Sequence, residues 1–168
     1  PITTESDRLQ GKVALITGAA HRIGAATTRL LHQAGACVAI HYRHSRQGAE
    51  ALCAELNHAR PDSAILLQGD LLESDHLAPL IATAVAAWGR LDILINNAST
   101  FYSTPIGQIT TAQWEDLIGT NLRAPLLLSQ AAAPYLKPQR GVIVNMVDIH
   151  AERPLKGYPL YSIAKAKA

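Results

Sequence analysis

Short apolar runs alternate with longer amphipathic stretches along the chain. The apolar runs contain mostly β-branched and aliphatic residues, and they predict strands over 13–17, 37–41, 64–68, 93–96 and 142–146. Because these runs do not alternate with polar residues, we expect strands that are covered on both faces. The stretches between them have the spacing of amphipathic helices over 23–34, 47–59, 75–88 and 111–136.

Residues at the ends of these stretches support the predicted helices. Gly35 and Gly89 stand where C-terminal caps belong, and Pro159 suits the first turn of a further helix. Strands that alternate with helices predict an α/β fold of the Rossmann type, with a doubly wound parallel sheet and helices on both faces. We expect a single domain over 1–168.

The chain ends at Ala168, inside the last predicted helix. A helix start with no strand, turn or cap after it is an unusual end for a domain. We therefore expect that C-terminal strands are missing, because the chain is truncated or incompletely observed. We also expect these 168 residues alone to be inactive, even where a longer protein is active.

The amino-acid composition limits the kinds of molecule that this protein is expected to bind. Of the 168 residues, 48% are hydrophobic and 17% are charged, which is typical of a folded globular protein. The net charge is +2 and the basic residues are scattered, so nothing indicates binding to nucleic acid or membranes. The sequence has no apolar run of membrane-spanning length, and 1–10 lacks the apolar core of a signal peptide. We expect a cytoplasmic protein with a small-molecule substrate.

Cysteine and histidine positions give little evidence for cross-links or metals. Cys37 and Cys53 lack the CxxC spacing, and we expect both to be reduced and structural. His41 and His44 are close enough in sequence to share a metal. No second pair of ligands is spaced to complete a zinc site, so we expect no metal.

The turn after the first predicted strand is suited to binding phosphate. It reads Thr17-Gly18-Ala19-Ala20-His21-Arg22-Ile23-Gly24 and opens the next predicted helix. Small residues allow the backbone to approach a pyrophosphate, and the N-terminus of a helix attracts anions. A glycine-rich turn alone is a weak signal, but the strand before it and the helix after it favour a dinucleotide site.

The residues at the end of the second predicted strand indicate whether the bound dinucleotide is NAD or NADP. The segment reads His41-Tyr42-Arg43-His44-Ser45, and no carboxylate that could bind the ribose of NAD occurs before Glu50. Arg43 and Ser45 offer donors for a 2′-phosphate, so we expect NADP(H), although a solvated loop would also contain such residues. Asp70 follows the third strand, either as an acceptor for the adenine amino group or as an ordinary turn residue.

Tyr161 and Lys165 are spaced so that one helical turn places both side chains on the same face. A phenol is a poor acid at neutral pH unless a nearby ammonium group lowers its pKa. Lys165 is placed to lower the pKa of Tyr161 in this way. The alternative is an ordinary exposed helix face, and the pair alone does not decide between the two.

These residues resemble the short-chain dehydrogenase/reductases over essentially the whole chain. The shared motifs are the turn over 17–24, Asn96-Asn97-Ala98, Asn121, and Tyr161 with Lys165. Within that superfamily the chain is most similar to the pteridine reductases. Arg22 replaces a glycine and Asp148 replaces a serine, as is typical of that group, and the stretches 56–71 and 96–105, including Ser99, Phe101 and Tyr102, are similar too.

One difference from the pteridine reductases concerns the cofactor. Members of that group have histidine and then arginine after the tyrosine, whereas here Arg43 precedes His44. This leaves open which side chain meets the 2′-phosphate. The resemblance implies cofactor binding by Gly18, His21, Arg22, Ile23, Gly24, Tyr42, Arg43, His44, Ser45, Asp70, Leu71, Asn97, Ala98, Ser99, Tyr161 and Lys165.

The resemblance also implies catalytic roles. Tyr161 would donate a proton, Lys165 would also hold the nicotinamide ribose, and Asn121 would act through a water molecule, although a structural asparagine remains an alternative. Asp148 should lie at the carboxyl end of the last strand. Partial burial there would raise the pKa of Asp148 and keep it partly protonated, unless it only caps a loop.

The implied substrate site consists of Arg22, Ser99, Phe101, Asp148 and Tyr161. Phe101 is the only phenylalanine, and it would stack on a flat pterin unless it belongs to the core. Ser99 would donate to the cofactor or substrate, or serve as a turn residue.

The expected function is NADPH-dependent reduction of pterins, with dihydrofolate and oxidised biopterin as further substrates. A ketone or 3-oxoacyl reductase is the alternative enzyme. A sensor that binds NADP without catalysis is the alternative of another class. The resemblance also implies a tetramer.

Overall fold

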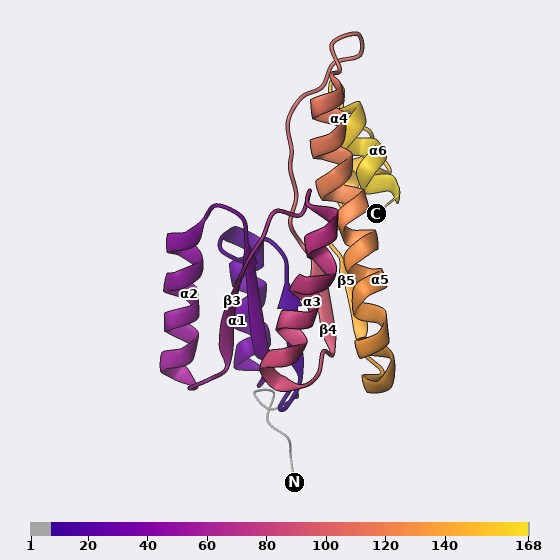
Figure 1. The fold of residues 1–168 in the computed structure, drawn as a ribbon. Helices are drawn as coiled ribbons and strands as arrows, with labels where there is room; N and C mark the ends of the chain where they lie inside the picture. The colour runs from indigo at the N-terminus through magenta and orange to yellow at the C-terminus, as the bar shows by residue number, and fades with distance from the viewer. Residues whose placement is uncertain (1–7, 168) are drawn as a thin grey trace.

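The computed structural model describes residues 8–167, so most of the polar segment 1–10 and Ala168 lie outside the described residues. Five strands form one parallel sheet in the order β3-β2-β1-β4-β5 (Figure 1). They are β1 (Val13–Ile16), β2 (Cys37–Tyr42), β3 (Ala64–Gln68), β4 (Ile93–Asn96) and β5 (Val142–Asn145). Leu15 of β1 is in register with Ala39 of β2 and Leu94 of β4. The strand order therefore reverses at β1, and in such sheets ligands bind beyond the carboxyl ends of the strands at this point.

Helices cover both faces of the sheet. On one face, α1 (Arg22–Gln33) and α2 (Arg46–Ala59) pack against a core that includes Ala14 and Ile16. On the other face, α3 (Ser74–Trp88) and α5 (Ala124–Leu136) pack against Val13 and Leu15. Alternate residues of β1 thus serve opposite cores, which confirms the predicted doubly wound α/β fold.

Most predicted boundaries agree with the structure to within one residue, but the stretch 111–136 does not form one regular α-helix. It consists of α4 (Thr111–Ile118), a π-helical turn η2 (Gly119–Arg123) and α5. A capping box between Thr110 and Gln113 starts α4. Amphipathic spacing predicts a helical stretch but does not reveal a one-turn change of hydrogen-bond pattern, and such turns are frequent at functional sites.

The edge strand β5 is another difference from the prediction. β1 and β4 are buried at every position, whereas Val142 is 49% exposed, Ile143 37% and Val144 39%. β5 pairs only with β4 within the described sheet, and α5 packs against it. The expectation that 142–146 is covered on both faces is therefore wrong here, because an apolar run does not specify which neighbours bury it.

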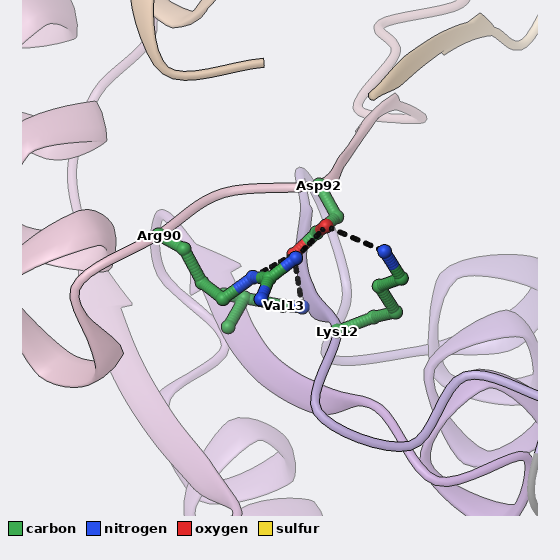
Figure 2. Close-up of polar contacts among 4 residues, drawn as sticks. All are labelled: Lys12, Val13, Arg90 and Asp92. Atoms are coloured by element: carbon green, nitrogen blue, oxygen red, sulfur yellow. Dashed lines mark hydrogen bonds and ion pairs between the residues drawn. The ribbon is translucent and has the colours of Figure 1, made fainter. Parts of the chain in front are cut away.

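A charged cluster joins the amino ends of β1 and β4 (Figure 2). Asp92 accepts two hydrogen bonds from Arg90, at 2.8 and 2.6 Å, and one from the backbone N–H of Val13 at 3.0 Å. Lys12 adds an ion pair at 3.3 Å. The carboxylate is almost fully buried, and it fixes the two central strands at the end of the sheet away from their carboxyl termini.

Several smaller predictions can also be compared with the structure. Gly35 and Gly89 have φ values of 104° and 73° after α1 and α3, which confirms their role at helix ends. Cys37 and Cys53 are free thiols, as expected. The last helix, α6 (Pro159–Lys167), begins at Pro159 as predicted and lies beside α4 (Figure 1). No helix within 8–167 is long and apolar enough to cross a membrane.

Candidate active site

A cavity of about 870 Å³ lies beyond the carboxyl ends of β1, β2 and β4. Its size falls within the usual range for small-molecule and cofactor sites. Fourteen of the residues predicted for the cofactor line it: Gly18, His21, Arg22, Ile23, Gly24, Tyr42, Arg43, His44, Ser45, Asp70, Leu71, Asn97, Ala98 and Ser99. Tyr161 and Lys165, predicted for both the cofactor and catalysis, are not among its lining residues.

Gly18 and Gly24 of the turn line this cavity with backbone atoms that no side chain covers. Gly18 has a φ of 62°, and a Cβ atom there would lie 2.9 Å from the Cα of Ala98. A Cβ at Gly24 would lie 2.7 Å from Nδ2 of Asn97 and would also collide with the carbonyl oxygen of Gly18. Only glycine fits at either position. A backbone that side chains cannot cover, followed by the N-terminus of α1, suits the pyrophosphate of a dinucleotide.

Arg22 is in a conformation that side chains rarely adopt. Its φ is 49°, in the left-handed region that the replaced glycine would occupy without strain. The side chain is exposed at the cavity and has no hydrogen bond or ion pair with another described residue. The strain at Arg22 therefore coincides with a free guanidinium group beside the phosphate turn.

Two polar residues hold the phosphate turn against β4. The hydroxyl of Thr17 accepts hydrogen bonds from the backbone N–H groups of Asn97 and Ala98, both at 3.0 Å. The side-chain amide of Asn97 donates to the carbonyl oxygens of Thr17 at 2.9 Å and Gly18 at 3.1 Å. These bonds connect the turn after β1 to the motif that ends β4.

His41 is a positioning residue that sequence reasoning missed. Its Nδ1 accepts a hydrogen bond from the backbone N–H of Gly18 at 3.2 Å, so Nε2 carries the proton and donates to the carbonyl oxygen of Gly69 at 3.1 Å. Burial lowers the pKa of His41 to about 4 and keeps the ring neutral. Both ring nitrogens are engaged, which argues against sharing a metal with His44, and no metal-ligating cluster occurs among the described residues. A histidine inside an otherwise apolar strand was the available signal.

Arg43 and Asp70 form an ion pair at 2.6 Å on the far side of the cavity. Asp70 also accepts a hydrogen bond from the backbone N–H of Leu72 at 3.0 Å, as an ordinary turn aspartate does. Ser45 is the N-cap residue of α2, but its hydroxyl makes no capping bond. The side chain of His44 has no partner among the described residues. Arginine, serine and a helix N-terminus thus meet at one corner of the cavity.

Tyr161, Lys165 and Asp148 form a second cluster beside the cavity. The hydroxyl of Tyr161 donates to Oδ2 of Asp148 at 2.8 Å. Nζ of Lys165 donates to the carbonyl oxygen of Met146 at 2.9 Å and lies 5.7 Å from the centre of the Tyr161 ring. Both α6 side chains are buried, so the pair is not an ordinary exposed helix face.

The directions of the pKa shifts in this cluster correct two expectations. Burial, together with the Asp148 carboxylate, raises the pKa of Tyr161 to about 12 instead of lowering it. The backbone N–H of His150 holds the pKa of Asp148 below its ordinary value, although burial acts in the opposite direction. Burial also lowers the pKa of Lys165, and the charge of Asp148 partly offsets this. Asp148 is thus ionised here, because it caps the short 3₁₀ turn η4 (Ile149–Ala151).

Asn121 lies in the π-helical turn and connects α4 to the segment that follows β4. Its Oδ1 accepts a hydrogen bond from Ser99 at 2.6 Å. Its Nδ2 donates to the carbonyl oxygens of Thr100 at 3.0 Å and Leu117 at 2.9 Å. The side chain is buried, and it positions the segment after β4 that lines the cavity.

Phe101 lies at the mouth of the site and is not a core residue. It is 52% exposed, its ring stacks on Tyr158 at a centroid distance of 4.7 Å, and its edge contact with Tyr161 has the same distance. The backbone N–H of Thr104 donates to the carbonyl oxygen of Gly157 at 2.8 Å. The loops before α4 and before α6 are therefore joined, and sequence reasoning did not identify Tyr158 or Gly157.

A family model described as short chain dehydrogenase matches residues 12–168, which is nearly the whole chain. The chain belongs to the short-chain dehydrogenase family. Membership of that family implies a nicotinamide cofactor. The cradle formed by Gly18 and Gly24 fits such a cofactor.

Curated relatives show where the chain lies within the family. It is 38% identical to pteridine reductase 1 of Leishmania tarentolae over 91% of the chain and 66% of that relative. It is 33% identical to a 3-oxoacyl-[acyl-carrier-protein] reductase of Synechocystis sp. and to a hydroxynaphthalene reductase of Aspergillus fumigatus. Those two alignments cover 94% of the chain and 64% and 57% of the relatives. The chain thus spans less than two thirds of the length of these relatives.

Proposed function

We propose that this protein reduces pterins with NADPH. The observation that carries the proposal is the hydrogen bond from Tyr161 to Asp148, directly beside the exposed ring of Phe101. A carbonyl oxygen needs one proton donor, which Tyr161 alone supplies, whereas a pterin needs protons at ring nitrogens and offers a flat aromatic face. A carboxylate paired with a phenol, next to an aromatic ring, suits the second kind of substrate better. The similarity to a pteridine reductase supports the same assignment.

The cavity residues would hold the cofactor in its extended form. Gly18, Gly24 and the start of α1 would take the pyrophosphate, with Arg22 as an additional cation. Arg43 and the free hydroxyl of Ser45 would take the 2′-phosphate at the N-terminus of α2. This corner favours NADPH over NADH, because a 2′-phosphate adds negative charge where a guanidinium group and a helix N-terminus lie.

The bound nicotinamide supplies the hydride, and the chain's own groups position the substrate and manage protons. Phe101 would stack on the pterin, and Ser99 would donate a hydrogen bond to it or to the cofactor. Tyr161, whose hydroxyl donates to Asp148 at 2.8 Å, would deliver its proton to the reduced ring. Lys165, buried beside Tyr161, would stabilise the phenolate that remains, and Asn121 would keep Ser99 in place.

Steady-state assays test this proposal. NADPH oxidation should be measured with dihydrobiopterin, biopterin and dihydrofolate, and in parallel with a ketone and a 3-oxoacyl thioester. We expect turnover of at least one pterin and loss of that turnover in Tyr161→Phe. Turnover of ketones or 3-oxoacyl substrates without any pterin would instead support a carbonyl reductase, as the other relatives suggest.

A further inference from the structure

His150 is a titratable group at the catalytic cluster to which the family motifs assign no role. Its backbone N–H donates to Oδ1 of Asp148 at 2.9 Å, so the start of η4 holds the residue against the carboxylate. Its ring nitrogen Nε2 lies 4.0 Å from the same Oδ1 atom. Asp148 thus presents one oxygen to Tyr161 and the other to His150.

The orientation of the imidazole is fixed. Its Nδ1 lies 3.1 Å from the carbonyl oxygen of Arg153, which can only accept, so Nδ1 carries a proton and donates it. Nε2 is therefore the nitrogen that gains or loses a proton, and it is the one that faces Asp148. The side chain is 26% exposed, so Nε2 can exchange protons with water while it remains beside the carboxylate.

We propose that His150 is a positioning residue that returns protons to the Asp148–Tyr161 pair from solvent. This inference rests on the proposed function, because it concerns the proton that the substrate takes. When the substrate removes a proton, the pair gains one negative charge. The imidazolium form of His150 then gives its Nε2 proton to Oδ1 of Asp148, the carboxyl group passes a proton on to the Tyr161 phenolate, and the neutral imidazole takes a proton from solvent. The transfer needs a closer approach than 4.0 Å, and catalytic hydrogen bonds often shorten when a substrate is bound.

The charged and titratable groups around His150 come from two elements. The turn supplies Asp148, and Glu152 and Arg153 follow it in sequence. Helix α6 packs on the turn and supplies Tyr161 and Lys165. Lys165 donates to the carbonyl oxygen of Met146, and Tyr161 donates to Asp148, so neither competes with His150 for Oδ1.

The test compares the pH dependence of kcat in the wild type, His150→Asn and His58→Asn. The asparagine amide can keep the hydrogen bond to Arg153 but cannot carry the proton, and His58 is an exposed histidine of α2 that serves as the control. For His150→Asn we expect kcat at pH 6 to fall about tenfold with KM unchanged, and imidazole in the buffer to restore it. An unchanged pH profile, or an equal loss at every pH that imidazole does not restore, would overturn the proposal.

A second measurement needs no turnover. The ring signals of His150 can be followed by NMR across pH in the wild type and in Asp148→Asn. We expect these signals to change position when the carboxylate is removed, because Nε2 lies 4.0 Å from Oδ1 of Asp148, and unchanged signals would overturn the proposal. A wild type that reduces no pterin would contradict the proposed function, while the NMR comparison would still decide whether Asp148 and His150 are coupled.

Discussion

The hydroxyl of Tyr161 donates to a carboxylate oxygen of Asp148, with 2.8 Å between the two oxygen atoms. This phenol thus has an anion as a hydrogen-bond partner, although the spacing of Tyr161 and Lys165 in the helix suggests a cation. A carboxylate stabilises the neutral phenol, because the phenolate would place two negative charges side by side. The proton consequently stays on the phenol until a substrate or another charge changes the balance.

The first prediction follows from this contact. Asp148→Asn should lower the pKa of Tyr161 from its value of about 12, because it removes the negative charge that acts together with burial to raise it. The measurement is ultraviolet absorbance of tyrosinate against pH, with Tyr161→Phe used to assign the transition. Asp75→Asn, an exposed carboxylate at the start of α3, is the control and should leave the transition in place. No shift in Asp148→Asn would mean that burial alone sets the pKa.

The second prediction concerns the ion pair of Arg43 with Asp70. Arg43→Ala should weaken NADPH binding about 10- to 100-fold and leave NADH binding nearly unchanged, because a hydrogen bond to a charged group contributes about 1.5–3 kcal/mol. Asp70→Asn should strengthen NADPH binding, since it releases the guanidinium group and removes a negative charge. Cofactor fluorescence gives both dissociation constants.

Arg29→Ala, which breaks an exposed ion pair with Glu55, serves as the control for this prediction. Equal effects on NADPH and NADH would assign the 2′-phosphate to His44 or Ser45.

The sequence predicted the sheet well because the signals for it are local. The run from Val13 to Ile16 is apolar throughout, and Gly18 follows at the turn, so a strand followed by a phosphate turn could be read directly. The exposure of Val144 could not be read in the same way. Whether a strand is covered depends on which elements pack on it, and those neighbours are far away in the sequence.

The site was less predictable than the fold because its residues act through partners that are distant in sequence. His41 is 23 residues from Gly18, and nothing in the spacing indicates that the two are bonded. The direction of the Asp148 pKa depended on a backbone N–H that only the η4 turn supplies. Residue types thus indicated which side chains to compare, but hydrogen-bond geometry decides their protonation states.

The third prediction compares a buried ion pair with an exposed one. Asp92→Ala should lower the free energy of unfolding by about 2–4 kcal/mol, because it leaves Arg90 and the backbone N–H of Val13 without their acceptor. Glu55→Ala breaks a similar two-point contact with Arg29, but that pair is exposed and should cost less than about 1 kcal/mol. Denaturant unfolding at neutral pH measures both. Equal losses would mean that burial of Asp92 adds nothing to the interaction.

The fourth prediction is a loss of stability in mild acid. The pKa of His41 is lowered by burial from 6.5 to about 4, so between these values the unfolded chain binds a proton that the folded chain does not. The contribution of His41 to stability should therefore be constant above pH 6.5 and fall as the pH decreases toward 4, by ~3 kcal/mol at 1.36 kcal/mol per pKa unit. Burial and the charge of Arg60 lower the pKa of His32 too, which adds to the same trend.

His41→Asn isolates the contribution of His41 to this acid sensitivity. The variant should be less stable at pH 7, because the geometry of two hydrogen bonds around Gly18 changes. It should also depend less on pH between 6.5 and 4, because asparagine does not titrate in that range. Denaturant midpoints over this range measure both effects, and His58→Asn, an exposed histidine, should keep the wild-type slope. A His41→Asn protein with the full wild-type slope would place the acid sensitivity elsewhere, with His32 the next buried histidine to replace.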